Sequence, residues 1–222
     1  MSVADNIHQL KSKLPAGVKL IAVSKFHPAE TVMEAYDAGH RVFGESRAQE
    51  LKAKQAILPT DIEWHFIGTL QRNKVKDIAA YIHTIHSVDS LKLLEEINKQ
   101  AAKQGRIIRI LLEVHIAQEA SKQGLSPEEC TDLLKDIRLS DYPNIKICGL
   151  MGMATDTDNR DLIRREFHLL RTLFDEIKQN FFPNDSSFSE LSMGMSGDYP
   201  IAIEEGSTMI RVGTFIFGNR TY

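Results

Sequence analysis

Apolar residues follow two different spacings along the chain, and these separate expected strands from expected helices. Short runs that are apolar almost throughout are typical of strands buried on both faces, whereas apolar residues three and four apart indicate one face of a helix. The expected strands are 18–24, 41–44, 62–68, 84–88, 107–115, 145–153, 191–195 and 209–217. The expected helices between them are 28–38, 47–57, 72–80, 90–104, 127–138, 159–179 and 199–205.

This alternation predicts a parallel sheet, because strands separated by helices need crossover connections. Eight such units predict a (β/α)8 TIM barrel with an additional N-terminal helix, in which Val3, Ile7 and Leu10 lie at helical spacing. A doubly wound open sheet is the alternative, but the first strand leads into Lys25 without a glycine-rich dinucleotide turn. We expect one domain over 1–222, with the helix and its link at 1–17 and the barrel at 18–222.

The composition excludes several classes of function. The 222 residues include 27 Lys+Arg and 30 Asp+Glu, a net charge of −3, with 42% hydrophobic and 26% charged residues. No polybasic arm, apolar run of roughly 18 residues or signal-peptide core is apparent. The only cysteines, Cys130 and Cys148, lack metal-finger spacing and are interpreted as buried thiols. We expect a cytoplasmic monomer with no nucleic-acid or membrane partner.

Lys25 is the sharpest candidate for chemistry. Alternation places Ile21, Val23 and Lys25 on one face, with Lys25 at the carboxyl end of its strand, where the active sites of this fold lie. Desolvation there disfavours the ammonium form and favours an amine that attacks a carbonyl to form a Schiff base. The alternative is a lysine that extends into solvent.

The loops after the last two strands have the composition of a phosphate site. Glycines let the backbone approach a ligand, while hydroxyls and the start of the helix at 199–205 supply donors. These residues are Gly194, Gly197, Gly213 and Gly218 with Ser192, Ser196, Ser207, Thr208 and Thr214. The alternative is that they only turn the chain.

Arg211 stands in an otherwise apolar run, 209–213. A buried guanidinium needs an acceptor, either on a ligand or on a carboxylate elsewhere in the barrel. A Schiff-base lysine, a phosphate site and an inward arginine together suit pyridoxal 5′-phosphate (PLP), with Arg211 at the pyridine nitrogen. A cation at that position opposes protonation of the ring and makes it a poorer electron sink.

Five segments carry a family resemblance. They are Ala22-Val-Ser-Lys25, Phe43-Gly-Glu45, Trp64-His-Phe-Ile-Gly68 with Leu70-Gln-Arg-Asn-Lys74, Leu191-Ser-Met-Gly-Met-Ser196, and Gly206-Ser-Thr-Met-Ile-Arg-Val-Gly-Thr214 with Ile216-Phe-Gly218. Over essentially its whole length the chain resembles the pyridoxal phosphate homeostasis protein family, a single-domain relative of the alanine racemase barrel.

The resemblance implies specific roles. Lys25 would hold PLP as an internal aldimine, and Arg211 would face the pyridine nitrogen. The residues implied for the phosphate are Ser196, Gly213 and Thr214. Two positions depart from the family pattern, because Ser46 stands in place of the usual asparagine and Thr69 in place of a frequent proline.

Several other residues receive structural interpretations. His65 is expected to be structural, and Lys122 is expected to be a solvated loop lysine. His83 and His86 suggest a metal pair, but they lie near the start of the fourth strand, at the wrong end of the barrel, so no metal is expected. The methionines expected to pack the barrel and flank the cofactor are Met151, Met153, Met193 and Met195.

Three functions stay open. The first is a PLP-binding carrier or regulator that could serve apo PLP-dependent enzymes without robust turnover. It is favoured because the racemase-type enzymes use a second domain for a further acid–base residue, whereas this chain stops at Tyr222. The second is a weak PLP-dependent racemase or related enzyme. The third is a phosphosugar aldolase that uses Lys25, which would be colourless and would trap a sugar phosphate on reduction.

Overall fold

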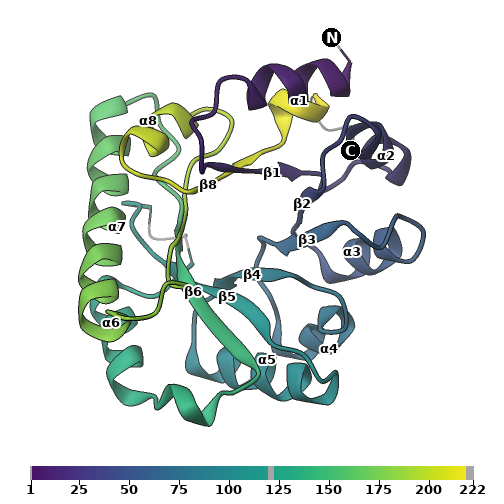
Figure 1. Ribbon diagram of the computed structural model, residues 1–222. Helices are drawn as coiled ribbons and strands as arrows, with labels where there is room; N and C mark the ends of the chain where they lie inside the picture. Colours follow the sequence, from purple (N-terminus) through teal and green to yellow (C-terminus); the bar gives the residue numbers. More distant parts are fainter. Residues whose placement is uncertain (1, 120–122, 219–222) are drawn as a thin grey trace.

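Eight parallel strands close into a barrel, in which each strand pairs with the next along the chain and the last pairs with the first (Figure 1). The computed structural model describes residues 2–119 and 123–218. The strands are β1 Lys19–Val23, β2 Val42–Glu45, β3 Glu63–Phe66, β4 Thr84–Val88, β5 Ile108–Val114, β6 Ile145–Gly152, β7 Glu190–Ser192 and β8 Met209–Val212. The predicted (β/α)8 TIM barrel with an additional N-terminal helix is confirmed.

Helices follow the strands and cover the outside of the barrel. They are α1 Val3–Lys11, α2 Ala29–Asp37, α3 Ala48–Gln55, α4 Val75–Ile78, α5 Leu91–Lys103, α6 Pro127–Asp136, α7 Arg160–Phe181, α8 Tyr199–Glu204 and α9 Thr214–Phe217, with 3-10 turns at Arg72–Lys74 and Leu139–Asp141. Ser2 and Ser126 cap α1 and α6 with capping boxes, which satisfy amides that begin each helix. Within the described residues, no helix has the length and apolar character needed to cross a bilayer.

The last predicted strand is too long. Residues 209–217 were expected to be extended because most of them are apolar, but β8 ends at Val212 and residues 214–217 form α9. Ile216 is buried, and its carbonyl accepts a hydrogen bond of 3.0 Å from the Asn6 side chain on α1. The turn after Gly213 therefore places α9 beside the N-terminal helix, where Figure 1 shows the yellow C-terminal segment.

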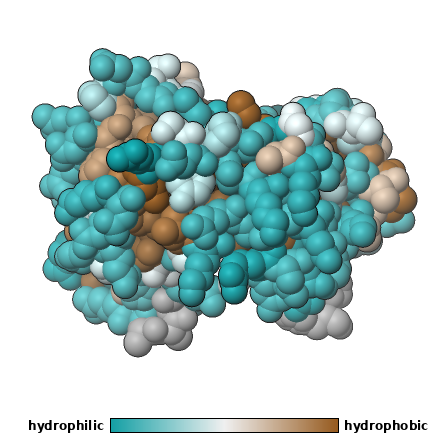
Figure 2. Space-filling model, turned by 90° about the horizontal axis from the view of Figure 1, so that it is seen from below, coloured by the Kyte–Doolittle hydropathy of each residue, from teal (hydrophilic) through white to brown (hydrophobic). Residues whose placement is uncertain are grey.

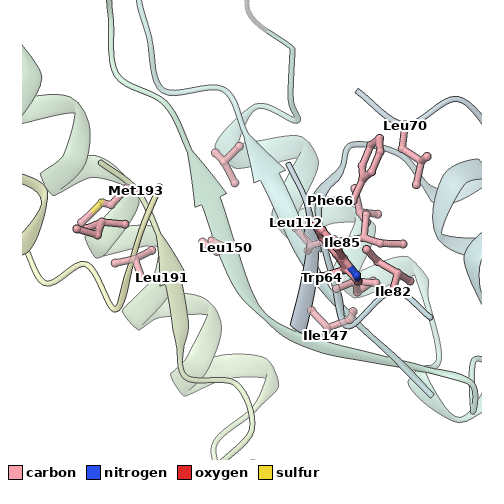
Figure 3. Close-up of a cluster of buried hydrophobic side chains, with 14 of the residues drawn as sticks. Trp64, Phe66, Leu70, Ile82, Ile85, Leu112, Ile147, Leu150, Leu191 and Met193 are labelled. Atoms are coloured by element: carbon pink, nitrogen blue, oxygen red, sulfur yellow. The ribbon is translucent and has the colours of Figure 1, made fainter. Parts of the chain in front are cut away.

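The main core lies between the strands and the surrounding helices. Trp64, Phe66, Ile85, Leu112 and Leu150 belong to one buried cluster, drawn in Figure 3. On the face shown in Figure 2, hydrophilic residues cover most of the surface, with the largest group of hydrophobic residues between them on the left side of the view and smaller ones at the upper and right edges. Burial of apolar surface on the outer face of the sheet leaves the barrel interior available for polar side chains.

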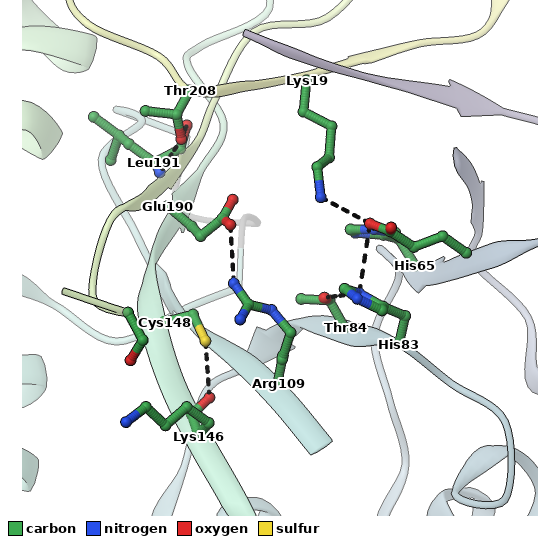
Figure 4. A network of polar contacts seen from close by, with 12 residues as sticks. Lys19, His65, His83, Thr84, Arg109, Lys146, Cys148, Glu190, Leu191 and Thr208 are labelled. Carbon is green, nitrogen blue, oxygen red and sulfur yellow. Dashed lines mark hydrogen bonds and ion pairs between the residues drawn. The ribbon is translucent and has the colours of Figure 1, made fainter. Parts of the chain in front are cut away.

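The interior at the amino end of the barrel is charged. Four charged residues lie at or next to the first positions of alternate strands: Lys19 on β1, Glu63 on β3, Arg109 on β5 and Glu190 on β7. Alternate strands of such a barrel supply one interior layer. Lys19 Nζ lies 2.8 Å from Glu63 Oε1, and Arg109 Nη2 lies 2.9 Å from Glu190 Oε1 (Figure 4). The alternating signs let these charges pair with one another at the base of the barrel.

Pairing of β6 with β7 depends on a glycine, and this gives the first testable prediction. A Cβ on Gly149 would lie 1.7 Å from the Glu190 carbonyl oxygen, whereas one on Gly105 would meet nothing within 4 Å. Both glycines have positive φ, so Gly105→Ala controls for backbone strain. We expect Gly149→Ala to lower the free energy of unfolding in urea by about 3 kcal/mol more than the control. Equal losses would show that β7 does not approach so closely.

Candidate functional site

A cavity of about 220 Å³ opens at the carboxyl ends of the strands and gathers all the predicted binding residues. Its lining includes Lys25, Ser196, Arg211, Gly213 and Thr214. These residues follow or belong to β1, β7 and β8, which the closed barrel makes neighbours. The volume is at the small end of ligand cavities and suits a single substituted ring.

Lys25 lies in a loop that the protein holds on both sides. The Ser24 hydroxyl donates to Glu45 Oε1 at 2.6 Å, and the Phe26 amide donates to Glu50 Oε1 at 2.7 Å. Phe26 has φ of 67°, a left-handed conformation that is uncommon for a bulky residue. These contacts fix the backbone on either side of the half-buried Lys25 side chain.

Lys54 on α3 is the residue that sequence reasoning missed here. Its buried ammonium donates to the Ser24 carbonyl at 2.7 Å, to Glu45 Oε1 at 2.6 Å and to Glu50 Oε1 at 2.8 Å. Burial raises the pKa of Glu45, and the Lys54 charge opposes that rise. The spacing of Glu50 and Lys54 on one helix face was the available signal, but such pairs are usually exposed.

Arg211 crosses the barrel interior from β8. It donates to the Ser192 carbonyl at 2.8 Å, to Ser192 Oγ at 2.6 Å and to the Gly152 carbonyl at 3.1 Å. These three acceptors are carbonyl and hydroxyl oxygens, while the charges of Asp198 and Glu113 favour the cationic form of Arg211. Burial lowers the pKa of Arg211 to about 10, so the group stays charged at neutral pH.

The loops after β7 and β8 offer unused amide donors beside the cavity. In the described ranges, the amides of Ser196 and Gly197 donate to no carbonyl or side chain. Thr214 begins α9, and the first amides of a helix have no partner within it. A Cβ on Gly213 would meet the Val23 carbonyl oxygen at 3.0 Å, so glycine permits the close approach of β8 to β1.

The other hydroxyls of these loops serve the fold. Ser207 Oγ donates to the carbonyls of Leu191 and Met193, and Thr208 Oγ1 accepts from the Leu191 amide. These contacts hold the segment before β8 against β7. Only Ser196 and Thr214 among the predicted hydroxyl residues line the cavity itself.

The predicted methionines divide into two pairs. Met153 and Met195 line the cavity, whereas Met151 and Met193 are buried in the interior packing. Lys122 lies outside the described residues. Thr69, one of the departures from the family pattern, donates its hydroxyl hydrogen to the Gln123 side chain, a bond that proline could not make. Ser46, the other departure, packs against Gly68, where an added Cβ would lie 2.5 Å from the Ser46 carbonyl oxygen.

His83 and His86 do not face one another as a pair. His86 bonds to His65 and Ser192 inside the barrel, whereas His83 lies near Glu63. Ligand-type atoms of Glu63, His65 and His83 lie within 4.8 Å of one another. The Lys19 ammonium already lies 2.8 Å from the shared Glu63 oxygen, so a positive charge is supplied there by the protein itself.

Comparison with known proteins identifies the class. The model of the alanine racemase N-terminal domain matches residues 1–221, so the chain belongs to this family of barrels. An alanine racemase structure from Clostridium difficile 630 superposes with a TM-score of 0.76 at 14% identity, covering 100% of this chain and 57% of the racemase chain. At that identity the likeness concerns the fold alone.

More similar relatives specify the family further. The chain is 41% identical over 205 residues to the pyridoxal phosphate homeostasis protein of Aquifex aeolicus, covering 92% of this chain and 88% of that protein. It is 35% identical to the one from Pasteurella multocida, covering 100% and 99%. PipY of Synechococcus elongatus with PLP bound has a TM-score of 0.88 at 40% identity, covering 98% and 100%. The chain therefore belongs to the pyridoxal phosphate homeostasis protein family.

The contacts of Lys54 with the segment that holds Lys25 give a second testable prediction. Lys54→Met should leave the buried Glu45 carboxylate without its ammonium partner. The second oxygen of Glu45 already has no hydrogen-bond partner in the described residues, so the carboxylate would lose much of its stabilisation. We expect the free energy of unfolding to fall by about 3–5 kcal/mol, the usual cost of breaking a buried pair. Lys52→Met, on the exposed face of the same helix, is the matched control. A loss no larger than that of the control would mean that the Lys54 contacts contribute little.

Proposed function

We propose that this protein binds PLP in the cavity at the carboxyl ends of the strands and acts in intracellular PLP homeostasis as a carrier or regulator. The observation that carries the proposal is the convergence of Lys25, Arg211 and the two loops after β7 and β8 on one cavity. PLP binding by PipY and the names of the relatives support the same ligand.

The residues present fit the chemical groups of PLP. When bound, the cofactor supplies an aldehyde that condenses with an amine, and Lys25 is the amine that lines the cavity. Lys25 would supply the nitrogen for this condensation, and the aldehyde oxygen would be released as water. We assign the phosphate to Ser196, Gly213 and Thr214, whose hydroxyl and amide donors match its oxygens.

Arg211 would face the pyridine nitrogen. Its guanidinium is fully buried and already held by Ser192 and Gly152, so it presents a fixed cation to the ring. A permanent donor there disfavours a proton on the ring nitrogen. The cofactor would therefore remain a weak electron sink, which suits storage better than turnover.

The proton-transfer groups in the cavity also favour a carrier. Among the described residues that line it, the acid–base side chains are Lys25 and Arg211, and Arg211 stays charged at neutral pH. Racemisation removes a proton from one face of a carbon and returns one to the other, which calls for two groups. Met195 lines the cavity and is 38% exposed, and we propose that an incoming amine reaches a bound ligand from this side.

Apo PLP-dependent enzymes are the proposed recipients, since they present such an amine. We place the protein in the cytoplasm as part of the same proposal. The described cysteines, Cys130 and Cys148, are free and buried, which agrees with a reducing compartment.

Attachment is tested by reduction of the loaded protein with borohydride, followed by peptide mapping. We expect the pyridoxyl group on Lys25. Lys25→Ala should lose the label and retain only weak binding through the phosphate. Lys13→Ala, at an exposed lysine that does not line the cavity, should keep the label. Recovery of the label mainly on Lys122 or another lysine would overturn the assignment.

The carrier role is tested by giving the loaded protein an apo-enzyme or an excess of amino acid. We expect transfer of PLP to the apo-enzyme, a changed transfer rate in Lys25→Ala, and racemisation no faster than with free PLP. Turnover of a common amino acid at roughly 1 s⁻¹ or above, the low end of ordinary enzymes, would establish catalysis in place of carriage.

A further inference from the structure

A continuous chain of hydrogen bonds runs through the barrel interior, from the cofactor cavity to the amino end. Arg211 Nη1 lies 2.6 Å from Ser192 Oγ, and Ser192 Oγ lies 3.0 Å from His86 Nδ1. His86 Nε2 lies 2.7 Å from His65 Nδ1, and His65 Nε2 lies 2.9 Å from Glu63 Oε1. The chain therefore connects β8, β7, β4 and β3 in turn.

The two ends of this chain determine where every hydrogen lies. A guanidinium only donates, and an ionised carboxylate only accepts. Burial raises the pKa of Glu63, but hydrogen bonds from His65 and Lys19 outweigh it, and the net pKa lies well below the ordinary value. Glu63 is therefore an acceptor, and His65 must carry its hydrogen on Nε2.

The same reasoning passes through the interior residues. A neutral His65 with its hydrogen on Nε2 accepts at Nδ1, so His86 must donate from Nε2 and accept at Nδ1. The donor to His86 is then the Ser192 hydroxyl, which accepts in turn from Arg211. Each hydrogen points away from the cavity and toward Glu63.

The surroundings keep both imidazoles neutral. His65 and His86 are fully buried, and burial lowers the pKa of each below its ordinary value. The Glu63 carboxylate raises the pKa of His65, but burial outweighs it, and the charges of Arg211 and Lys19 oppose a further positive charge between them. In this arrangement a proton added at His65 Nδ1 would face the hydrogen on His86 Nε2, and one added at His86 Nδ1 would face the Ser192 hydroxyl hydrogen.

We infer that His65 and His86 are positioning residues, which hold the Ser192 hydroxyl as an acceptor for Arg211 and anchor this one-directional chain on Glu63. The inference deepens the proposed function, because Arg211 is the group assigned to the pyridine nitrogen. Figure 4 shows the anchored end, where the Lys19 side chain reaches the carboxylate beside His65.

The hydrogen positions are tested on the protein without cofactor. Long-range proton–nitrogen NMR correlation of ¹⁵N-histidine protein distinguishes the two neutral tautomers and the charged ring. We expect His65 and His86 both to carry hydrogen on Nε2 at pH 7.5, with assignment from nuclear Overhauser contacts in the wild-type protein. A hydrogen on Nδ1 of either ring, or a charged ring, would overturn the inference whether or not PLP binds.

The influence on Arg211 is tested by titration with two ligands, PLP and an analogue whose ring nitrogen is replaced by a C–H group. We expect His86→Phe to weaken PLP by about threefold to tenfold, the worth of one buried hydrogen bond, and to leave the analogue unchanged. His83 lies near Glu63 but is not a member of the hydrogen-bonded chain, so His83→Gln should change the affinity for neither ligand.

Two results would contradict this role. An equal loss for both ligands would mean that His86 only supports the fold, and no loss for either would mean that Arg211 does not depend on it. If His86→Phe does not fold, Ser192→Ala makes the same comparison from the adjacent link. Failure of wild-type protein to bind PLP at all would contradict the proposed function and leave the NMR result intact.

Discussion

The pairing of β1 with β8 is the contact on which the site depends. Its register aligns Lys19 with Met209 and Ile21 with Arg211, so the two strands run side by side to their carboxyl ends. Lys25 follows one of these ends and Gly213 the other. In an open sheet with this same strand order the first and last strands would be opposite edges, and the amine could not share a cavity with the residues assigned to the phosphate.

Closure also creates an interior that must hold charge. The barrel places Arg211 and two histidines away from water, where an unpaired polar group is costly, and leaves Glu63 half-buried. The hydrogen-bonded chain satisfies them in sequence, and the charged layer at the amino end completes the arrangement with Lys19. One hydrogen-bonded network therefore connects the cavity at the carboxyl end of the barrel with the charged layer at the amino end.

The barrel and two of the residues that line its cavity could be predicted from the sequence, because the spacing of apolar residues in a strand or helix is visible in a short stretch of sequence. The barrel follows from eight alternating units, and Lys25 and Arg211 follow from their positions at the ends of apolar strands. The limit of β8 was missed, since the apolar residues of 214–217 suit a strand as well as a helix that packs on α1. Lys54 and His86 were missed for another reason. Their roles arise from partners far away in the sequence, and burial of a charge or of an imidazole depends on the closed fold.

In the proposed PLP site, one cavity joins the Lys25 amine, the loops assigned to the phosphate and Arg211. The most direct test is the absorption spectrum of the purified protein after incubation with PLP and removal of the excess. We expect a visible band that stays with the protein and disappears on addition of hydroxylamine. A protein that remains colourless, with no ligand retained, would contradict it.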